Sequence, residues 1–206
     1  MAESSSHPDS AQDLMVDLES DEVALETHEV DPEGDIYLEI ENSLILVSSK
    51  VLSLASPVFS TMLNSHFRER LAGQQGLEKP RITLQEDDAP TMELICRVLH
   101  HCADNVPEVL EEDMIVEIVE HCDKYDCAAP LKAWVTTWIW GTYHGLDESD
   151  RGSSGLLLAA YVFDRAKAFS VISMSVIMHQ DEPFTWLPIL SSHDLVEKGL
   201  PGNKDP

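Results

Sequence analysis

Residues 34–63 have the sequence GDIYLEIENSLILVSSKVLSLASPVFSTML, and this stretch determines the expected fold. Apolar and polar side chains alternate over residues 35–40, which is the period of a β-strand with one buried face. Residues 41–43 predict a turn, and residues 44–48 predict a second strand that is more continuously apolar. The two strands should therefore form a β-hairpin.

A helical stretch follows the hairpin. Its apolar side chains recur at helical spacing: Val51, Leu52, Ala55, Phe59, Met62 and Leu63. Ser56 is a favourable N-cap. Pro57 suits the first helical position, because an N–H group there would have no acceptor within the helix. We therefore expect two short helices with a break at Ser56.

The chain beyond residue 80 continues with one strand and several helices. Residues 81–84 predict a third strand that ends at an acidic turn. Helices are expected over about residues 89–102, 113–125 and 130–140, because each range carries an apolar face at helical spacing. Short strands followed by packed helices are typical of an α+β domain with a helical majority.

The last third of the chain predicts a helical extension of this domain. Ser153 can cap a helix, and a second apolar pattern begins near Phe169, so residues 147–206 should hold two short amphipathic helices and a frayed end. We expect the two helices to pack against the helix of residues 130–140. The predicted organisation is thus a tail over residues 1–33, a domain over residues 34–146 and the extension.

Acidic side chains outnumber basic ones throughout the sequence. The 206 residues include 38 Asp and Glu against 13 Lys and Arg, for a net charge of −25. Residues 1–41 hold 14 of the acidic side chains and no basic one, so residues 42–206 keep 24 acids against 13 bases, a net charge of −11. A negative surface repels phosphate groups, so we expect neither direct nucleic-acid binding nor a membrane partner.

The N-terminal tail has too few apolar residues and no aromatic one to form a core. We expect residues 1–33 to be intrinsically disordered, with folding beginning near Gly34. Residues 14–22 join a short apolar run, including Val16 and Leu18, to acids and a serine, which resembles a SUMO-interacting motif. The simpler interpretation, which we prefer, is an acidic tail that happens to contain a few aliphatic residues.

The sequence predicts an intracellular protein, in the cytoplasm or the nucleus. Its N-terminus lacks the basic start and apolar run of a secretory signal. Its longest apolar stretches, residues 155–163 and 168–178, are far shorter than the ~20 residues that a membrane span requires.

The cysteines can be interpreted in two ways. Cys96, Cys102, Cys122 and Cys127 lie near several histidines, which is compatible with a structural zinc site. The spacings C-x5-C and C-x4-C are not those of zinc knuckles, however, and Cys96, Cys102 and Cys122 fall at apolar helical positions. Buried free thiols explain the cysteines more simply, so we expect no metal and no cofactor.

The ordered set of these segments resembles a BTB/POZ domain, and their amino-acid sequence is close to that of the fungal branch of that family. The resemblance covers about residues 34–140, and its carrying segments are residues 34–38, 46–52, 55–59, 67–69, 82–88 and 123–127. It implies a compact α+β domain that mediates self-association or docks other proteins. We therefore expect a noncatalytic interaction protein that contacts a second copy, as a homodimer, or another protein through the apolar residues of positions 51–63.

One position departs from the pattern of many animal members of the family. Ser48 stands where those members carry a histidine that pairs with the residue held here by Asp35. Asp35 then has two possible roles, pairing with Lys50 or capping the hairpin. The departure removes the support for corepressor binding through a charged pocket.

A second role that the resemblance implies is that of a substrate adaptor for a cullin-type ubiquitin ligase. Family members with this role carry a hydrophobic-x-Glu signal, which Val109-x-Glu111 or Leu110-x-Glu112 would provide. The glutamates also suit the start of a helix, because negative charge there is favoured by the helix dipole. Leu110 and Glu111 are therefore candidates for partner contact, with helix initiation as the alternative.

No constellation for catalysis is found in the sequence. It contains no phosphate-binding glycine loop, nucleophile elbow or HExxH motif, and its acid pairs lie at predicted turns or helix starts. His121 with Cys122 or Cys127 lacks an orienting group, and adjacent residues on a helix do not face each other. We therefore expect that the protein is not an enzyme.

Overall fold

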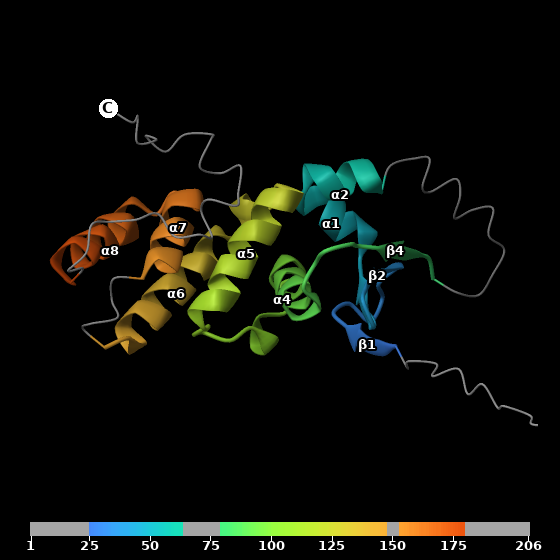
Figure 1. Ribbon diagram of the computed structural model, residues 1–206. Helices are drawn as coiled ribbons and strands as arrows, with labels where there is room; N and C mark the ends of the chain where they lie inside the picture. Colours follow the sequence, from blue (N-terminus) through green and yellow to red (C-terminus); the bar gives the residue numbers. More distant parts are fainter. Residues whose placement is uncertain (1–24, 64–78, 148–152, 180–206) are drawn as a thin grey trace, which may run out of the picture.

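The computed structural model describes residues 25–63, 79–147 and 153–179, and these residues form an α+β structure (Figure 1). Its elements in chain order are β1 (Glu26–Glu29), β2 (Ile36–Ile40), β3 (Ser43–Val47), α1 (Ser49–Ala55), α2 (Pro57–Met62), β4 (Arg81–Thr83), α4 (Ala89–Leu99), the 3₁₀-helix η1 (Ala103–Asn105), α5 (Glu112–Tyr125), α6 (Ala128–Gly145), α7 (Ser154–Val162) and α8 (Ala166–His179). The predicted α+β class is confirmed. So are the short strands that precede the helices.

The strands form one sheet in the order β1-β3-β2-β4. β2 and β3 make the predicted antiparallel hairpin, with Leu38 opposite Ile45. The alternation in β2 buries Ile36, Leu38 and Ile40 on one face, as a half-buried strand requires. β4 then adds in parallel to β2, with Ile82 beside Leu38.

The first strand precedes Gly34, the residue near which we expected folding to begin. β1 precedes Gly34 and pairs in parallel with β3, with Thr27 beside Leu44. The sequence Glu-Thr-His-Glu has no apolar alternation, because this edge strand is held by backbone hydrogen bonds rather than by a buried face. The start at Gly34 was therefore too late. The remainder of the predicted tail, residues 1–24, lies outside the described residues.

Gly34 has a different role from that of a domain boundary. A Cβ atom at this position would lie 2.8 Å from the carbonyl oxygen of Val47 and 2.9 Å from that of Asp31. Only a residue without a side chain allows the turn after Val30 to approach the end of β3 this closely. Gly34 therefore connects β1 to the hairpin within the folded region.

The helices confirm the sequence patterns, with two changed boundaries. α4 ends at Leu99 instead of residue 102, because His101 adopts a left-handed backbone conformation with φ of 60°. α6 extends over Ala128–Gly145 instead of residues 130–140. In its additional C-terminal turn Thr142 is buried and Tyr143 packs against the core.

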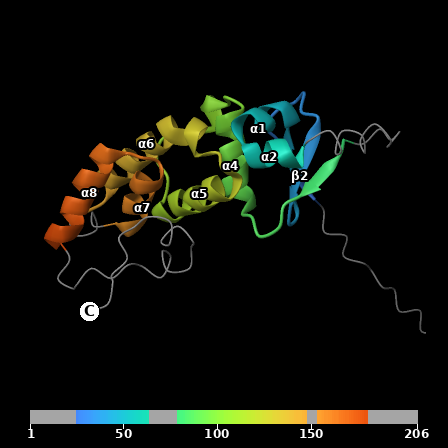
Figure 2. The same cartoon turned by 90° about the horizontal axis from the view of Figure 1, so that it is seen from above.

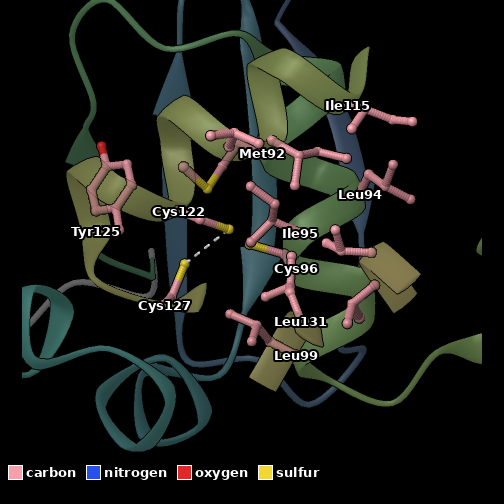
Figure 3. Packing of buried hydrophobic residues seen from close by; sticks show 14 of the residues in the cluster. Met92, Leu94, Ile95, Cys96, Leu99, Ile115, Cys122, Tyr125, Cys127 and Leu131 are labelled. Carbon is pink, nitrogen blue, oxygen red and sulfur yellow. Dashed lines mark hydrogen bonds between the residues drawn. The ribbon is translucent and has the colours of Figure 1, made fainter. Parts of the chain in front are cut away.

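The helices continue the core away from the sheet. α4 and α5 lie between the sheet and α6, and α7 and α8 lie at the end opposite α1 and α2 (Figures 1 and 2). Figure 3 shows Met92, Ile95 and Cys96 of α4 and Cys122 of α5 in one apolar interior. Among the described residues no helix is both long and apolar enough to cross a membrane.

The extension begins as predicted, but it is not formed by two amphipathic helices. The Ser153 hydroxyl accepts a hydrogen bond from the Leu156 N–H at 3.1 Å and caps α7. α7 is buried on all sides over residues 155–160, where it packs against α5, α6 and α8. The sequence beyond His179 lies outside the described residues.

Candidate interaction surface

The helix pair α1–α2 is fixed at its first turn by Asp35. The Asp35 carboxylate accepts hydrogen bonds from the backbone N–H of Ser49 at 2.7 Å and from the Ser49 hydroxyl at 2.6 Å. Negative charge is favourable there, because the first N–H groups of a helix lack partners. Of the two roles considered for Asp35, this contact supports capping, at the helix that follows the hairpin.

The break between the two helices is tied to the end of α5. The Ser56 hydroxyl accepts the backbone N–H of Phe59 at 2.9 Å, which makes Ser56 the predicted N-cap of α2. The same hydroxyl donates to the carbonyl oxygen of Tyr125 at 2.5 Å. The Phe59 and Tyr125 rings stack with their centroids 4.5 Å apart, so α2 and α5 are held together by polar and apolar contacts.

The six apolar residues proposed as a contact surface do not lie together on the outside. Leu52, Phe59 and Leu63 belong to the core of the chain itself. Val51 and Ala55 are half-buried at the margin of this core, and Met62 is 37% exposed. The apolar face of the helix pair packs against the chain's own core at α4 and α5, which leaves three of the six residues unavailable to a partner.

Leu54 is the accessible apolar side chain that the helical spacing missed. It lies on α1 and is 80% exposed, more than any other large apolar side chain in the described part of the chain. Its neighbour two positions earlier, Leu52, is fully buried, and positions two apart on a helix point to different sides. Position 54 lay outside the predicted apolar stripe, and this was the signal that could have identified it.

The segment before α5 separates the two possible hydrophobic-x-Glu motifs. The Leu110 side chain is half-buried, and its carbonyl oxygen accepts the Thr142 hydroxyl. Glu112 accepts the backbone N–H of Gly155 at 2.9 Å. Val109, by contrast, is 58% exposed, and Glu111 is an exposed N-cap without a side-chain capping bond. The Val109-x-Glu111 pair is therefore the accessible one.

A buried polar cluster joins the turn before α4 to α5. The Asp87 carboxylate, whose side chain is 1% exposed, accepts the Tyr125 hydroxyl at 2.6 Å and pairs with the Lys124 ammonium at 3.0 Å. Burial and the bond to Asp87 raise the pKa of the Tyr125 phenol. His121 Nε2 accepts the backbone N–H of Asp88 at 3.2 Å and lies 3.3 Å from Asp87 Oδ1. The cluster connects two elements inside the protein.

The imidazole ring of His100 is hydrogen-bonded to the backbone just before α1. Its Nδ1 lies 2.8 Å from the carbonyl oxygen of Cys96, and its Nε2 accepts the backbone N–H of Ser48 at 3.0 Å. The two contacts together require a neutral ring with its proton on Nδ1. Burial lowers the pKa of His100 below its ordinary value, because the charged ring would lose its hydration.

Folding stability should therefore fall as the pH drops below about 6.5, the ordinary pKa of histidine. The unfolded chain takes up the proton at His100 more readily than the folded chain does, so acid favours unfolding. We predict that His100→Gln reduces the dependence of the unfolding free energy on pH between pH 7.5 and 5, by at most about 1.4 kcal/mol per pH unit. Urea titrations at several pH values measure this slope.

The neighbouring residue supplies the control for this prediction. His101 is exposed and left-handed, a conformation that asparagine tolerates, and its charge contributes only the smallest part of the lowering of the His100 pKa, so His101→Asn should reduce the slope by much less than His100→Gln does. Equal slopes for the wild type and His100→Gln would show that His100 does not contribute.

The cysteines are mainly packing residues. Cys96, Cys122 and Cys127 are buried, which confirms the prediction for these three, while Cys102 is only half-buried beyond the end of α4. The Sγ atoms of Cys122 and Cys127 are 3.9 Å apart (Figure 3). Burial raises the pKa of Cys96, and the hydrogen bond shared between the Cys122 and Cys127 thiols together with burial raises that of Cys122, which disfavours reactive thiolates. No group of three or more possible metal ligands occurs among the described residues.

The tail residues proposed for SUMO binding, Val16 and Leu18, lie outside the described residues.

Comparison with known proteins identifies the family to which this architecture belongs. Residues 28–137, more than half of the chain, match the family model described as the BTB/POZ domain. The match begins within β1 and ends within α6, so it contains β2–β4, α1–α2 and the polar cluster around Asp87. Among curated proteins, none matches the chain. The chain therefore belongs to the BTB/POZ family, whose domain is generally a noncatalytic module for protein–protein interaction.

Proposed function

We propose that the protein is a noncatalytic interaction protein that self-associates through the α1–α2 surface, defined by Leu54 and Met62 with the margins of Val51 and Ala55. The observation that carries the proposal is the 80% exposure of Leu54. Leu54 is held on a short helix whose opposite side is fixed to the core through Leu52 and capped by Asp35. An apolar anchor on such a preorganised helix loses little conformational freedom when it binds.

The size of the expected contribution follows from burial. Removing one leucine side chain from water stabilises a complex by about 1.5–3 kcal/mol. In a twofold symmetric dimer the same residue is buried twice, so the two copies of Leu54 together contribute about 3 kcal/mol or more. That free energy corresponds to a dissociation constant about 100-fold lower.

Sedimentation velocity of the full chain tests this proposal. We predict reversible association of the wild type in the micromolar range and a dissociation constant at least about 100-fold higher for Leu54→Glu, because the carboxylate cannot be buried at the contact. Val109→Glu is the matched control, since it adds the same charge at another exposed apolar position. A strict monomer up to tens of micromolar, or an unchanged equilibrium in Leu54→Glu, would remove the self-association proposal.

The second candidate function, adaptor for a cullin-type ligase, is supported by the accessibility of Val109 and Glu111. Leu110 and Glu112 are engaged within the chain, so the accessible pair should carry the contact. Copurification of a cullin that is lost in Glu111→Lys and retained in Leu54→Glu would support this function. Retention of the cullin in Glu111→Lys would exclude this contact.

Three further features of the sequence support narrower proposals. We propose that the protein acts in the cytoplasm or the nucleus and that it belongs to the fungal branch of the family. We also propose that the acidic tail keeps the protein soluble. SUMO binding by residues 14–22 is the alternative for the tail. A peptide of residues 8–28 that shows no SUMO binding at high micromolar concentration, or binds equally after replacement of Val16 and Leu18 by alanine, would exclude it.

A further inference from the structure

α8 presents apolar side chains on two opposite sides. Ala168, Ile172 and Val176 are buried, and the helix packs on α7. On the opposite side, four apolar residues at helical spacing are exposed, and we call them the exposed α8 face: Val171 (37% exposed), Met174 (56%), Ile177 (74%) and Met178 (71%). A large apolar face on a helix is normally covered by another element, whichever side of the helix it occupies. The exposed α8 face therefore lacks a covering element among the described residues.

The sequence that directly follows α8 has the composition of such a cover. Residues 183–190 read Pro-Phe-Thr-Trp-Leu-Pro-Ile-Leu, between the acidic pair of residues 181–182 and the serine pair of residues 191–192. Proline fixes φ near the value of a polyproline II helix, and it disfavours an α-helical conformation in the residue before it. Pro183 and Pro188 therefore favour an extended, polyproline-type segment.

The side chains of this segment repeat with the threefold period of a polyproline II helix. One edge carries Glu182, Thr185, Pro188 and Ser191. The two other edges carry Phe184, Leu187 and Leu190, and Pro183, Trp186 and Ile189. With three residues per turn, the large apolar side chains thus gather on two adjacent edges, and the third edge suits solvent.

We propose that residues 183–190 dock on the exposed α8 face of the same chain as a polyproline-type segment, with Trp186 against the methionines and Thr185 toward water. The contact joins two apolar surfaces and leaves the acidic and serine pairs outside. It is separate from the α1–α2 surface, which lies at the opposite end of the molecule (Figures 1 and 2).

The reach of the chain permits this contact. The exposed α8 face extends over seven residue steps, or ~10 Å at 1.5 Å per residue. Eight residues in polyproline II conformation span ~25 Å at 3.1 Å each. The segment is therefore long enough to run back along the whole face, with residues 180–182 left over as the link for a chain reversal after His179.

Connection within one chain favours this occupant over a second copy. A short link between two sites gives an effective concentration of about millimolar, above ordinary protein concentrations. The turn that reverses the chain needs only the polar residues Gln180, Asp181 and Glu182, which precede Pro183.

Photocrosslinking in the full chain tests the proposal. The probe is p-benzoylphenylalanine in place of Trp186, whose excited ketone reacts readily with methionine side chains. The chain with the probe is mixed with an excess of isotope-labelled chain without it, so that mass spectrometry separates links within a chain from links between chains. We expect links to the peptide containing Met174 and Met178 of the unlabelled chain, and their loss in Met174→Asp/Ile177→Asp.

The matched control places the same probe at Thr185, on the edge assigned to solvent. The probe at position 185 should form far fewer links to the α8 peptide than the probe at position 186, and the circular dichroism spectrum should be unchanged. Links mainly to labelled chains would replace the proposal by docking of a second copy. Links to another element, absence of links from position 186, or equal yields from positions 185 and 186 would also overturn it. Carrying out the experiment in Leu54→Glu as well makes the result independent of the proposed self-association.

Discussion

Replacing Phe59 by alanine should lower the free energy of unfolding by about 3–5 kcal/mol, because the substitution empties a fully buried aromatic site. The ring lies parallel to that of Tyr125, with an interplanar angle of 1°, so its loss also removes the aromatic contact between α2 and α5. Urea unfolding followed by far-ultraviolet circular dichroism measures the change. We expect a lower midpoint with a similar dependence on urea concentration.

Leu54→Ala is the control on the same helix pair. Because Leu54 is 80% exposed, its truncation should change the unfolding free energy of the monomer by no more than about 0.5 kcal/mol. The two substitutions thus separate the folding role of Phe59 from the proposed partner contact of Leu54. A loss below about 1 kcal/mol for Phe59→Ala would contradict the core position of Phe59.

Removal of the Asp87 carboxylate should have the second large effect. We predict that Asp87→Ala lowers the free energy of unfolding by about 3 kcal/mol, because it leaves the Tyr125 hydroxyl without its acceptor in the interior. The Lys124 ammonium is 44% exposed and regains hydration, so most of the loss comes from the phenol and from the emptied site. Urea unfolding at pH 7.5 measures this loss.

A double-mutant cycle with Tyr125→Phe makes this prediction specific. If the hydrogen bond carries the effect, Tyr125→Phe should destabilise the wild type by about 1.5–3 kcal/mol and Asp87→Ala by much less. Asp123→Ala removes an exposed carboxylate from α5 and should be within about 0.5 kcal/mol of the wild type. Additive effects of Asp87→Ala and Tyr125→Phe would show that the hydrogen bond is not the cause.

Local sequence signals predicted most elements of the fold. The alternation in residues 35–40 identified β2, and Ser56 followed by Pro57 identified the break between α1 and α2. These signals depend on neighbouring residues, which the sequence displays directly. β1 lacked such a signal, because its pairing with β3 uses backbone groups that every residue carries.

The candidate surface was less predictable than the fold. Helical spacing correctly grouped Leu52, Phe59 and Leu63, but an apolar stripe is buried first against the chain's own core. Leu54 lies outside that stripe, and this position indicates an exposed apolar side chain once the stripe itself is taken to be buried. The same limit applies to α7 and α8, whose apolar composition did not show which sides α5 and α6 cover.

Hydrogen–deuterium exchange of the full chain below and above its association midpoint tests the central claim, self-association through the α1–α2 surface, most directly. We predict that amides of residues 49–62 exchange more slowly at the higher concentration, that amides of α6 are unchanged, and that Leu54→Glu abolishes the difference. Protection confined to another element, or association without added protection at residues 49–62, would contradict the claim.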